Sequence, residues 1–396
     1  MGFKRMTDKV KWVGKIDWEL RSFHGDEYST DRGSSYNAYL IRDEKTVLID
    51  TVWEPFGEEW LKELKQEIDL DEIDYIIAQH SEIDHSGALP LILKERPDMP
   101  IYCTSNGADI LRGHFHEEWN FVEVKTGDTL DIGESTLTFV EARMLHWPDN
   151  MMTYMDGEAI LFSNDAFGQH YASELLYNDS VDQCELYEEA IKYYANILNP
   201  FSMLVKNKIK EVLSLELPLN MIATSHGVIW RDNPTQIIEK YVEWADNYQE
   251  NQITLVFDTM WGATRRMAEA IAQGIHEVDD TITIKLYNAA ITDKNDVITE
   301  LFKSKGILFG SLTVNKGIMN AGGGLLEMIR GIGFKNKKGA AFGSYGWSGE
   351  SVKIIEEKLK DAKLEVLEDG PLVLWNPNEE GIEECIEFGK KFAEQF

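Results

Sequence analysis

The stretch His80-Ser81-Glu82-Ile83-Asp84-His85 places two imidazoles and two carboxylates within six residues. The apolar residues 75–78 come directly before it, and residues 86–91 follow with small and apolar side chains. This order is typical of a buried strand, a short polar loop and the first turn of a helix. The segment therefore predicts a loop that presents metal ligands at the end of a strand.

The side chains of this loop are those that bind transition metals. Imidazole suits iron, zinc, copper and nickel, and carboxylate oxygen is a harder ligand. Structural zinc takes four ligands, and catalytic zinc takes three protein ligands plus water. A single loop with four donors supplies more than one zinc ion needs. We therefore expect two metal ions, with further ligands from later in the chain.

Composition and charge exclude several classes of protein. A formal net charge of -30 over 396 residues disfavours binding to nucleic acid or to an anionic membrane, since both draw on clusters of Lys and Arg. The N-terminus lacks the apolar core of a signal peptide, and no apolar run approaches the ~18 residues of a membrane span. Cys103, Cys184 and Cys385 form no C-x-x-C pair. These features predict a cytoplasmic protein.

The pattern of predicted strands and helices changes near residues 247–252. Before this polar stretch we expect short strands at 35–41, 46–50, 136–140, 159–162 and 221–224, with helices at 58–67, 184–215 and 234–245. After it, strands at 253–257, 281–287, 306–309, 340–342 and 364–367 alternate with helical segments, which indicates a parallel doubly wound sheet. The predicted domains are residues 1–249 and 250–396.

Three later residues could complete the metal site. His146, Asp165 and His226 each follow a predicted strand, where loops at one end of a sheet can converge. Each one alone has a simpler explanation, because a lone His after a strand is more often a surface or capping residue and Asp165 could be a helix N-cap. The loop at residues 80–85 strengthens the metal interpretation, since it requires partners.

The series His80-x-Glu82-x-Asp84-His85, His146, Asp165 and His226 resembles the ligand series of the flavodiiron proteins, also called A-type flavoproteins. The motifs at 145–149 and 164–170 also match that family, and the resemblance spans nearly the whole chain. It implies an α/β fold with a metallo-β-lactamase-like αββα sandwich followed by a flavodoxin-like doubly wound parallel sheet. Zinc hydrolases of the same fold usually carry His where Glu82 stands, so Glu82 favours iron.

The resemblance also implies roles for single residues. His80, Glu82 and His146 would hold one non-haem iron; Asp84, His85 and His226 would hold the other. Asp165 would bridge the two ions. His24 and Tyr194 would be catalytic residues that orient or protonate a bound gas. His170 is a further candidate beside the ligands, and His85 is the ligand expected to be the least firmly held.

A second constellation lies at the ends of three predicted strands in the second domain. The first loop precedes a helix, whose N-terminus favours a phosphate. It is neither a G-x-G-x-x-G nor a P-loop motif, which disfavours a site for a dinucleotide or for ATP. Aromatic side chains in the loops suit a flat ring, and the pattern resembles an FMN site. The expected FMN-binding residues are Thr259, Met260, Trp261, Gly262, Ala263, Thr264, Ser311, Thr313, Val314, Asn315, Ser344, Tyr345, Gly346, Trp347, Ser348 and Gly349.

Taken together, the resemblance predicts a reductase that passes electrons through FMN to a diiron site and reduces O2 to water, NO to N2O, or both. Because the sequence has no pair of C-x-x-C motifs, we expect a separate donor, a rubredoxin or another reductase. A head-to-tail homodimer or a tetramer of such dimers is implied, as is a role in detoxification in an anaerobe or microaerobe. Two alternatives remain: a zinc hydrolase with an accessory flavodoxin-like module, and an FMN electron carrier with a structural metal site.

Overall fold

The computed structural model describes residues 2–214 and 216–396, and the chain forms two compact units. The first unit comprises Met1–Tyr194 and Phe201–Val242, and the second comprises Ala195–Pro200 and Glu243–Phe396. Residues 243–249 group with the second unit, where the Tyr248 ring stacks on Phe302 at 5.6 Å. The predicted boundary between residues 249 and 250 stays a proposal.

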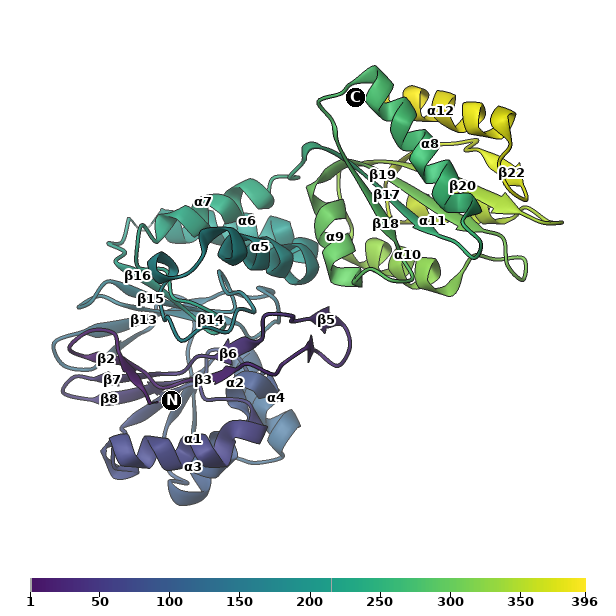
Figure 1. Cartoon of the computed structure of the whole chain (residues 1–396). Coiled ribbons are helices and arrows are strands. Elements are labelled where there is room, and N and C mark those ends of the chain that lie inside the picture. The colour runs from purple at the N-terminus through teal and green to yellow at the C-terminus, as the bar shows by residue number, and fades with distance from the viewer. Residues whose placement is uncertain (1, 215) are drawn as a thin grey trace. The chain divides into compact units, whose positions relative to one another are not determined.

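Two sheets form the centre of the first unit (Figure 1). The first sheet has the order β1 (Lys4–Arg5), β2 (Val10–Trp12), β7 (Tyr39–Arg42), β8 (Thr46–Ile49), β9 (Tyr75–Ile77), β10 (Ile101–Cys103) and β11 (Phe121–Glu123). The second has the order β12 (Thr129–Asp131), β13 (Thr136–Glu141), β14 (Met151–Met155), β15 (Ile160–Asn164) and β16 (Met221–Thr224). Two small ribbons pair β3 (Lys15–Asp17) with β6 (Ser34–Tyr36), and β4 (Ser22–Phe23) with β5 (Tyr28–Ser29).

Alternating side chains of the strands build two separate cores. Ile41 and Ile49 face the second sheet and pack with Phe139 and Phe162, whereas Leu48 points the other way, into the helices. That outer layer consists of α1 (Glu54–Glu67), α2 (Ile83–Ser86), α3 (Leu89–Glu95) and α4 (Ser105–Phe115). The second sheet is covered by α5 (Gln183–Tyr193), α6 (Ser202–Leu213) and α7 (Thr235–Trp244) (Figure 1). The unit is therefore the predicted αββα sandwich.

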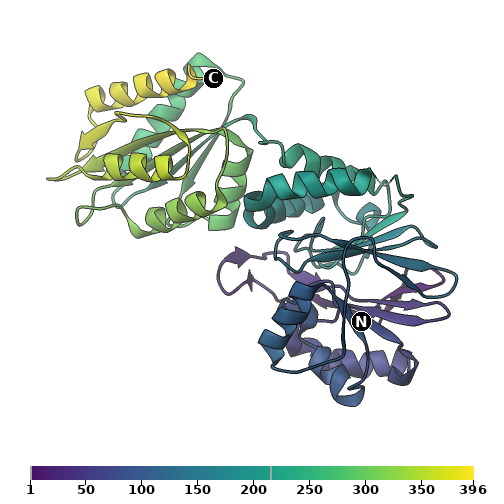
Figure 2. The same cartoon turned by 180° about the vertical axis from the view of Figure 1, so that it is seen from behind.

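The second unit contains a parallel sheet. Its order is β18 (Thr283–Asn288), β17 (Glu250–Asp258), β19 (Ser304–Leu312), β20 (Lys338–Tyr345) and β21 (Glu365–Leu367), and β22 (Leu372–Leu374) also pairs with β20. One face is covered by α8 (Ala263–Val278) and α12 (Glu379–Ala393), and the other by α9 (Lys294–Lys303), α10 (Asn320–Ile332) and α11 (Ser351–Asp361) (Figures 1 and 2). This is the doubly wound sheet that the alternating pattern predicts.

One predicted strand is split. Residues 35–41 form the end of β6 and most of β7, with a break at Asn37. The Asn37 backbone N–H donates to Ser225 O at 2.8 Å, and its side chain donates to Thr224 O and Gly227 O. These bonds replace strand-to-strand hydrogen bonds at Asn37. The chain therefore leaves the pairing of β6 with β3 and enters the sheet as β7, beside the loop that carries His226.

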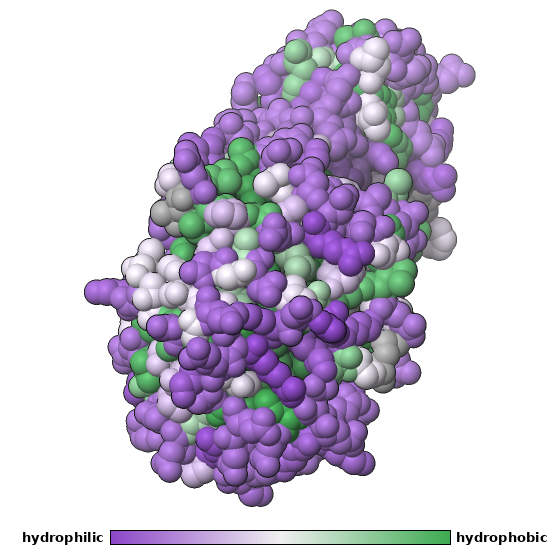
Figure 3. Space-filling view, turned by 90° about the vertical axis from the view of Figure 1, so that its left-hand side faces the viewer, coloured by the Kyte–Doolittle hydropathy of each residue, from purple (hydrophilic) through white to green (hydrophobic). Residues whose placement is uncertain are grey.

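Hydrophilic side chains cover most of the molecular face drawn in Figure 3, with smaller apolar patches between them. Among the described residues, no helix combines the length and apolar character that crossing a membrane requires.

Candidate functional site

The ligand-bearing loops of the first unit leave their sheets at corresponding strand ends. β13 and β15 are both antiparallel to β14, and β16 is parallel to β15, so β13, β15 and β16 all run in one direction. The loops after them carry His146, Asp165 and His226. The loop and short helix α2 after β9 of the facing sheet carry the other four predicted ligands. Sheet topology therefore brings together residues that lie far apart in the sequence.

The seven predicted ligands form two groups. The first consists of His80, Glu82, His146 and Asp165, and within it one donor atom from each residue lies within 4.8 Å of the others. His80 Nε2 lies 3.1 Å from Glu82 Oε2, and His146 Nε2 lies 3.1 Å from Asp165 Oδ2. Carboxylate and imidazole atoms at these separations can share one metal ion.

The second group consists of Asp84, His85 and His226, again within 4.8 Å of one another. Asp84 Oδ2 lies 3.2 Å from the Nε2 atoms of both His85 and His226. Both oxygens of Asp84 and both ring nitrogens of His85 are buried and make no well-aligned hydrogen bond to any residue that the structure describes. A buried charged group without such a partner is costly, and a metal ion would satisfy these atoms. The residues thus fit a bound cation.

The carboxylate of Asp165 lies between the two groups. Its Oδ2 is 3.1 Å from His146 Nε2 and 3.6 Å from His80 Nε2, and its Oδ1 is 3.1 Å from His85 Nε2 and 3.6 Å from His226 Nε2. One oxygen therefore faces each group, which is the arrangement that a bridging ligand requires.

Several residues that support the ligands escaped the sequence prediction. The Asp149 carboxylate lies beside His80 Nδ1 at 3.1 Å, and Ser225 Oγ donates to Asp165 Oδ1 at 2.5 Å. His226 Nδ1 lies 2.7 Å from the backbone oxygen of Ser35 and can donate to it. Asp149 stands within the His146-Trp147-Pro148-Asp149 motif, which was the one signal that could have indicated it.

The charges of the site favour cations. Although burial opposes ionisation, the nearby histidines lower the pKa of Asp165 and Glu82 well below the usual range, so both remain ionised. Burial lowers the pKa of His85, but the Asp84 and Asp165 carboxylates outweigh it and raise that pKa to about 9. In the absence of a metal the His85 imidazole would therefore hold a proton, and metal binding would release it.

His24 lies at the rim of the first group, in the turn between β4 and β5. Its Nε2 is 2.8 Å from Glu82 Oε1, and its ring centroid is 6.0 Å from that of His146. Burial lowers the pKa of His24, but the bond to Glu82 prevails and raises it. The adjacent Phe23 ring packs on His170 at 4.6 Å and on His226 at 5.7 Å, so this turn covers ligands of both groups.

Tyr194, the other predicted catalytic residue, lies in different surroundings. Its hydroxyl bonds to Ser202 Oγ at 3.0 Å and its ring packs on Tyr241. Its neighbour Tyr193 instead packs on His170 at 5.3 Å and His226 at 6.4 Å. Burial, followed by the charges of Asp165 and of other site carboxylates, raises the pKa of Tyr193. Tyr193 is the tyrosine that faces the ligands, because adjacent helical residues project in different directions.

The predicted FMN loops of the second unit lie side by side. β17, β19 and β20 are neighbours and parallel, with Asp258 opposite Ser311 and Leu312 opposite Ser344. The carboxyl ends of these strands therefore present all three loops along one edge. The strand order reverses beside β17, and such switch points are where open α/β sheets bind ligands.

The first loop has the features of a phosphate site. Gly262 adopts a left-handed conformation at the N-cap of α8, donates its N–H to Thr259 Oγ1 at 3.0 Å, and offers no side chain to cap the helix. Among the described residues, no side chain caps the first N–H groups of α8, so an anion can accept from them. Trp261 and Trp347 are 87% and 88% exposed, so flat apolar surfaces flank the same edge. The residues fit a flavin mononucleotide.

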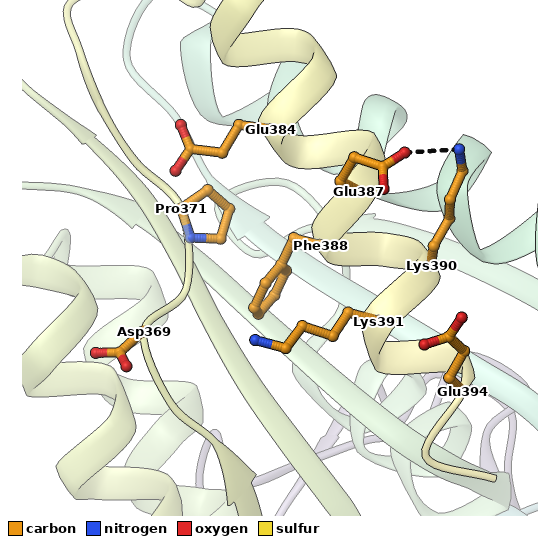
Figure 4. Close-up of a pocket in the computed structure, with 8 residues that line it drawn as sticks. All are labelled: Asp369, Pro371, Glu384, Glu387, Phe388, Lys390, Lys391 and Glu394. Carbon is orange, nitrogen blue, oxygen red and sulfur yellow. Dashed lines mark hydrogen bonds and ion pairs between the residues drawn. The ribbon is translucent and has the colours of Figure 1, made fainter.

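A separate hollow lies in the second unit beside α12 (Figure 4). Charged side chains of α12 line one side, with Glu387 bonded to Lys390 at 2.7 Å, and Asp369 and Pro371 line the other. None of the predicted metal or FMN residues lines it.

Two family models match the chain. The model of the ODP family beta lactamase matches residues 35–227, and the flavodoxin model matches residues 255–389. Each match falls on one of the two folds described above.

Curated relatives and solved structures extend the likeness over the whole chain. The anaerobic nitric oxide reductase flavorubredoxins of Klebsiella pneumoniae and Escherichia coli are each 55% identical over 99% of this chain and 81% and 82% of their own lengths. The rubredoxin oxygen:oxidoreductase of Desulfovibrio gigas is 35% identical with a TM-score of 0.95, over 99% of this chain and 98% of its own. The flavodiiron protein of Giardia intestinalis is 33% identical with a TM-score of 0.93, over 100% and 97%.

Proposed function

This chain belongs to the flavodiiron protein family, and we propose that it is an oxidoreductase that uses FMN and a non-haem diiron site to reduce NO to N2O, O2 to water, or both. The observation that carries this proposal is the pair of ligand groups that share Asp165, one carboxylate oxygen facing each group. A dinuclear site of this kind can bind a diatomic molecule at two adjacent metals.

The chain's own residues would hold the metals in the proposed arrangement. His80, Glu82 and His146 would bind one iron, Asp84, His85 and His226 the other, and Asp165 both. When bound, FMN accepts reducing equivalents and the iron ions supply the redox chemistry at the gas. Burial of most of these ligands keeps competing water away from the site.

Two residues are placed to handle protons, which both reductions consume. His24 lies next to Glu82, and although burial lowers the pKa of His24, the contact with Glu82 raises it overall. The hydroxyl of Tyr193 stays protonated because burial raises its pKa. We propose His24 and Tyr193 as the proton-donating side chains, in place of the predicted pair His24 and Tyr194. Phe23 would exclude water from above the ligands.

We propose NO as the preferred gas. The 55% identical relatives are named nitric oxide reductases, which favours NO, whereas the less similar D. gigas protein is named for oxygen. O2 reduction therefore remains the second candidate activity. Both gases are small enough for the same ligand set.

We propose a rubredoxin as the electron donor, because relatives carry rubredoxin in their names. The three cysteines of this sequence form no C-x-x-C pair, so the donor's iron–thiolate centre must come from residues outside it. We further propose a cytoplasmic location and a head-to-tail homodimer, or a tetramer of such dimers, in which each FMN serves the metals of the partner. The exposed Trp261 and Trp347 support a covering partner at the FMN edge. Sedimentation of a fully active monomer would refute the dimer.

The alternative functions lose support. Glu82 takes part in the first ligand group, at the position where zinc hydrolases of this fold carry His. An electron carrier with a structural metal would not need a partly exposed imidazole beside the first ligand group, such as that of His24, whose side chain is 31% exposed.

The test is anaerobic turnover. Protein reconstituted with two equivalents of iron and one of FMN is supplied with reduced rubredoxin, and NO loss, N2O formation and, separately, O2 uptake are recorded. We expect N2O in step with NO loss, and a D165N variant that retains FMN but loses turnover. Wild-type protein with full iron and FMN that consumed neither gas would refute the proposed function.

A further inference from the structure

We propose that Asp149 is a positioning residue of the metal centre, whose carboxylate fixes the His80 ring and makes the first ligand group retain its metal more firmly than the second. This inference rests on the proposed diiron site. It concerns a residue outside the seven predicted ligands. It also states that the two metal positions differ in how firmly they retain their ions.

The contacts of Asp149 hold its carboxylate in one orientation. The side chain is buried, and its two oxygens lie 3.2 and 3.1 Å from His80 Nδ1. The backbone N–H of Ser81 donates to Oδ2 at 2.7 Å, and Thr104 Oγ1 donates to the Asp149 backbone oxygen at 3.1 Å. With Nδ1 donating to the carboxylate, the Nε2 lone pair of His80 is left to point at Glu82 and Asp165.

In the second group, no carboxylate of the described residues is hydrogen-bonded to an outer ring nitrogen. His226 Nδ1 faces a neutral acceptor, the Ser35 backbone oxygen, at 2.7 Å. His85 Nδ1 is buried without a hydrogen-bond partner among the described residues. Among the described residues, the outer nitrogen of His80 has an anionic partner and that of His226 a neutral one, whereas that of His85 has no hydrogen-bond partner and the buried Asp50 carboxylate acts on His85 only electrostatically.

The difference has a direct consequence for metal retention. A carboxylate that accepts the outer N–H of a ligating imidazole fixes the ring and increases the electron donation of the inner nitrogen. Loss of such a partner typically costs about 10–100-fold in metal affinity. A ring with no outer partner must also be ordered when the metal binds. The first group should therefore release its metal last.

The experiment follows iron release from the 396-residue protein, loaded anaerobically with two equivalents of Fe(II), into an excess of a strong Fe(II) chelator. The wild-type protein is expected to release iron in two phases of one equivalent each. In D149N, which keeps the side-chain shape but removes the charge, the slow phase should accelerate by about 10–100-fold while the fast phase stays unchanged.

The matched control is D43N. Asp43 is likewise a carboxylate with a buried side chain that accepts backbone N–H groups, but it lies at the β7–β8 turn and bonds to Lys9 rather than to the metal ligands. D43N should keep both wild-type phases. Equal acceleration of both phases in D149N would show a structural role alone, and an unchanged slow phase or a single wild-type phase would also overturn the inference.

A second measurement does not depend on the variant folding. In wild-type protein labelled with 15N-histidine and loaded with Zn(II), which the same ligand types bind, the His80 Nδ1–H proton should resonate far downfield, exchange slowly and show a cross-peak to the Ser81 amide. A rapidly exchanging His80 proton would overturn the inference. Failure of wild-type protein to take up two equivalents of metal would instead refute the proposed diiron site.

Discussion

The hydroxyl groups of Tyr193 and Tyr194 have different surroundings although the two residues are adjacent. Tyr193 ends α5 with its ring against His170 and His226, whereas Tyr194 begins a π-helical turn and bonds to Ser202. The sequence Tyr193-Tyr194 offers no means of choosing between them. The phase of the helix decides which hydroxyl can serve the site.

The substitutions Y193F and Y194F separate these two environments. If Tyr193 donates a proton to the bound gas, Y193F should reduce NO turnover by about a hundredfold without loss of iron. Y194F should leave turnover near wild type and lower the free energy of unfolding by about 1 kcal/mol through the lost bond to Ser202. The opposite pattern of rates would return the role to Tyr194.

At the scale of elements, the turn between β17 and α8 depends on one backbone conformation. Gly262 has φ 87°, and a Cβ atom added there would meet nothing within 4 Å. The need for glycine is thus conformational rather than steric, since other residues pay roughly 1–2 kcal/mol in the left-handed region. The same turn aims the first N–H groups of α8 at the proposed phosphate.

A G262A substitution should therefore weaken FMN binding by about 5–30-fold, the equivalent of 1–2 kcal/mol. Fluorescence titration of the FMN-free protein measures the dissociation constant. G331A is the matched control, because Gly331 lies inside α10, has open space at Cβ and needs no positive φ. Equal affinities in G262A and wild type would show that the turn relaxes without strain.

Lys337 lies at the amino-terminal ends of the strands of the same sheet, opposite the edge with the FMN loops, and contacts the segments that precede β17 and β19. It immediately precedes β20 and is buried, and its Nζ lies within hydrogen-bond distance of three backbone oxygens, those of Phe302 at 2.7 Å, Ser304 at 2.5 Å and Tyr248 at 3.3 Å. Burial lowers the pKa of Lys337 to about 7. The folded state therefore disfavours the charged amine that the unfolded chain carries up to about pH 10.4.

This residue should make stability rise with pH. Between pH 7 and 10 the unfolded chain binds a proton that the folded chain does not, so the free energy of unfolding increases across that window. Each unit of pKa shift corresponds to about 1.4 kcal/mol. Urea unfolding of the FMN-bearing unit, followed by flavin fluorescence from pH 7 to 9, should show a flatter dependence in K337M than in wild type. Parallel curves would contradict a neutral buried lysine.

At the scale of the whole molecule, each unit has its own core and its own cofactor residues. The apolar clusters of the first unit draw on its two sheets and flanking helices, and that of the second draws on β17, β19, β20, α8 and α12. All seven predicted metal ligands belong to the first unit, and the predicted FMN loops belong to the second. Bound metal ions should thus stabilise the first unit, and bound FMN should stabilise the second.

Calorimetry of protein depleted of metal or of FMN tests this independence. Chelation should lower the melting temperature of one transition only, and flavin removal that of the other. Each ligand at 100–1,000 times its dissociation constant contributes about 3–4 kcal/mol to the unit that binds it. Equal shifts of both transitions after either treatment would show that the units unfold together.

Much of this architecture was predictable because its signals are local. Apolar runs before polar loops indicated β9, β13, β15 and β16, and Met221–Thr224 forms β16 as expected. Alternation of apolar strands and helices indicated the parallel sheet and its loops. The ribbon β4–β5 and the pairing of β3 with β6 were not predicted, since strands of two or three residues carry no periodic pattern.

The sequence by itself determined the two fold types and predicted seven metal ligands and the loops for FMN, because residue types, their spacing and their periodicity are properties of the linear chain. Only the tertiary structure decided that Asp165 presents one oxygen to each ligand group, that Asp149 supports His80, and that Tyr193 rather than Tyr194 faces the site. Those relations depend on strand direction, helix phase and burial across segments distant in sequence, and such geometry arises when the layers pack together.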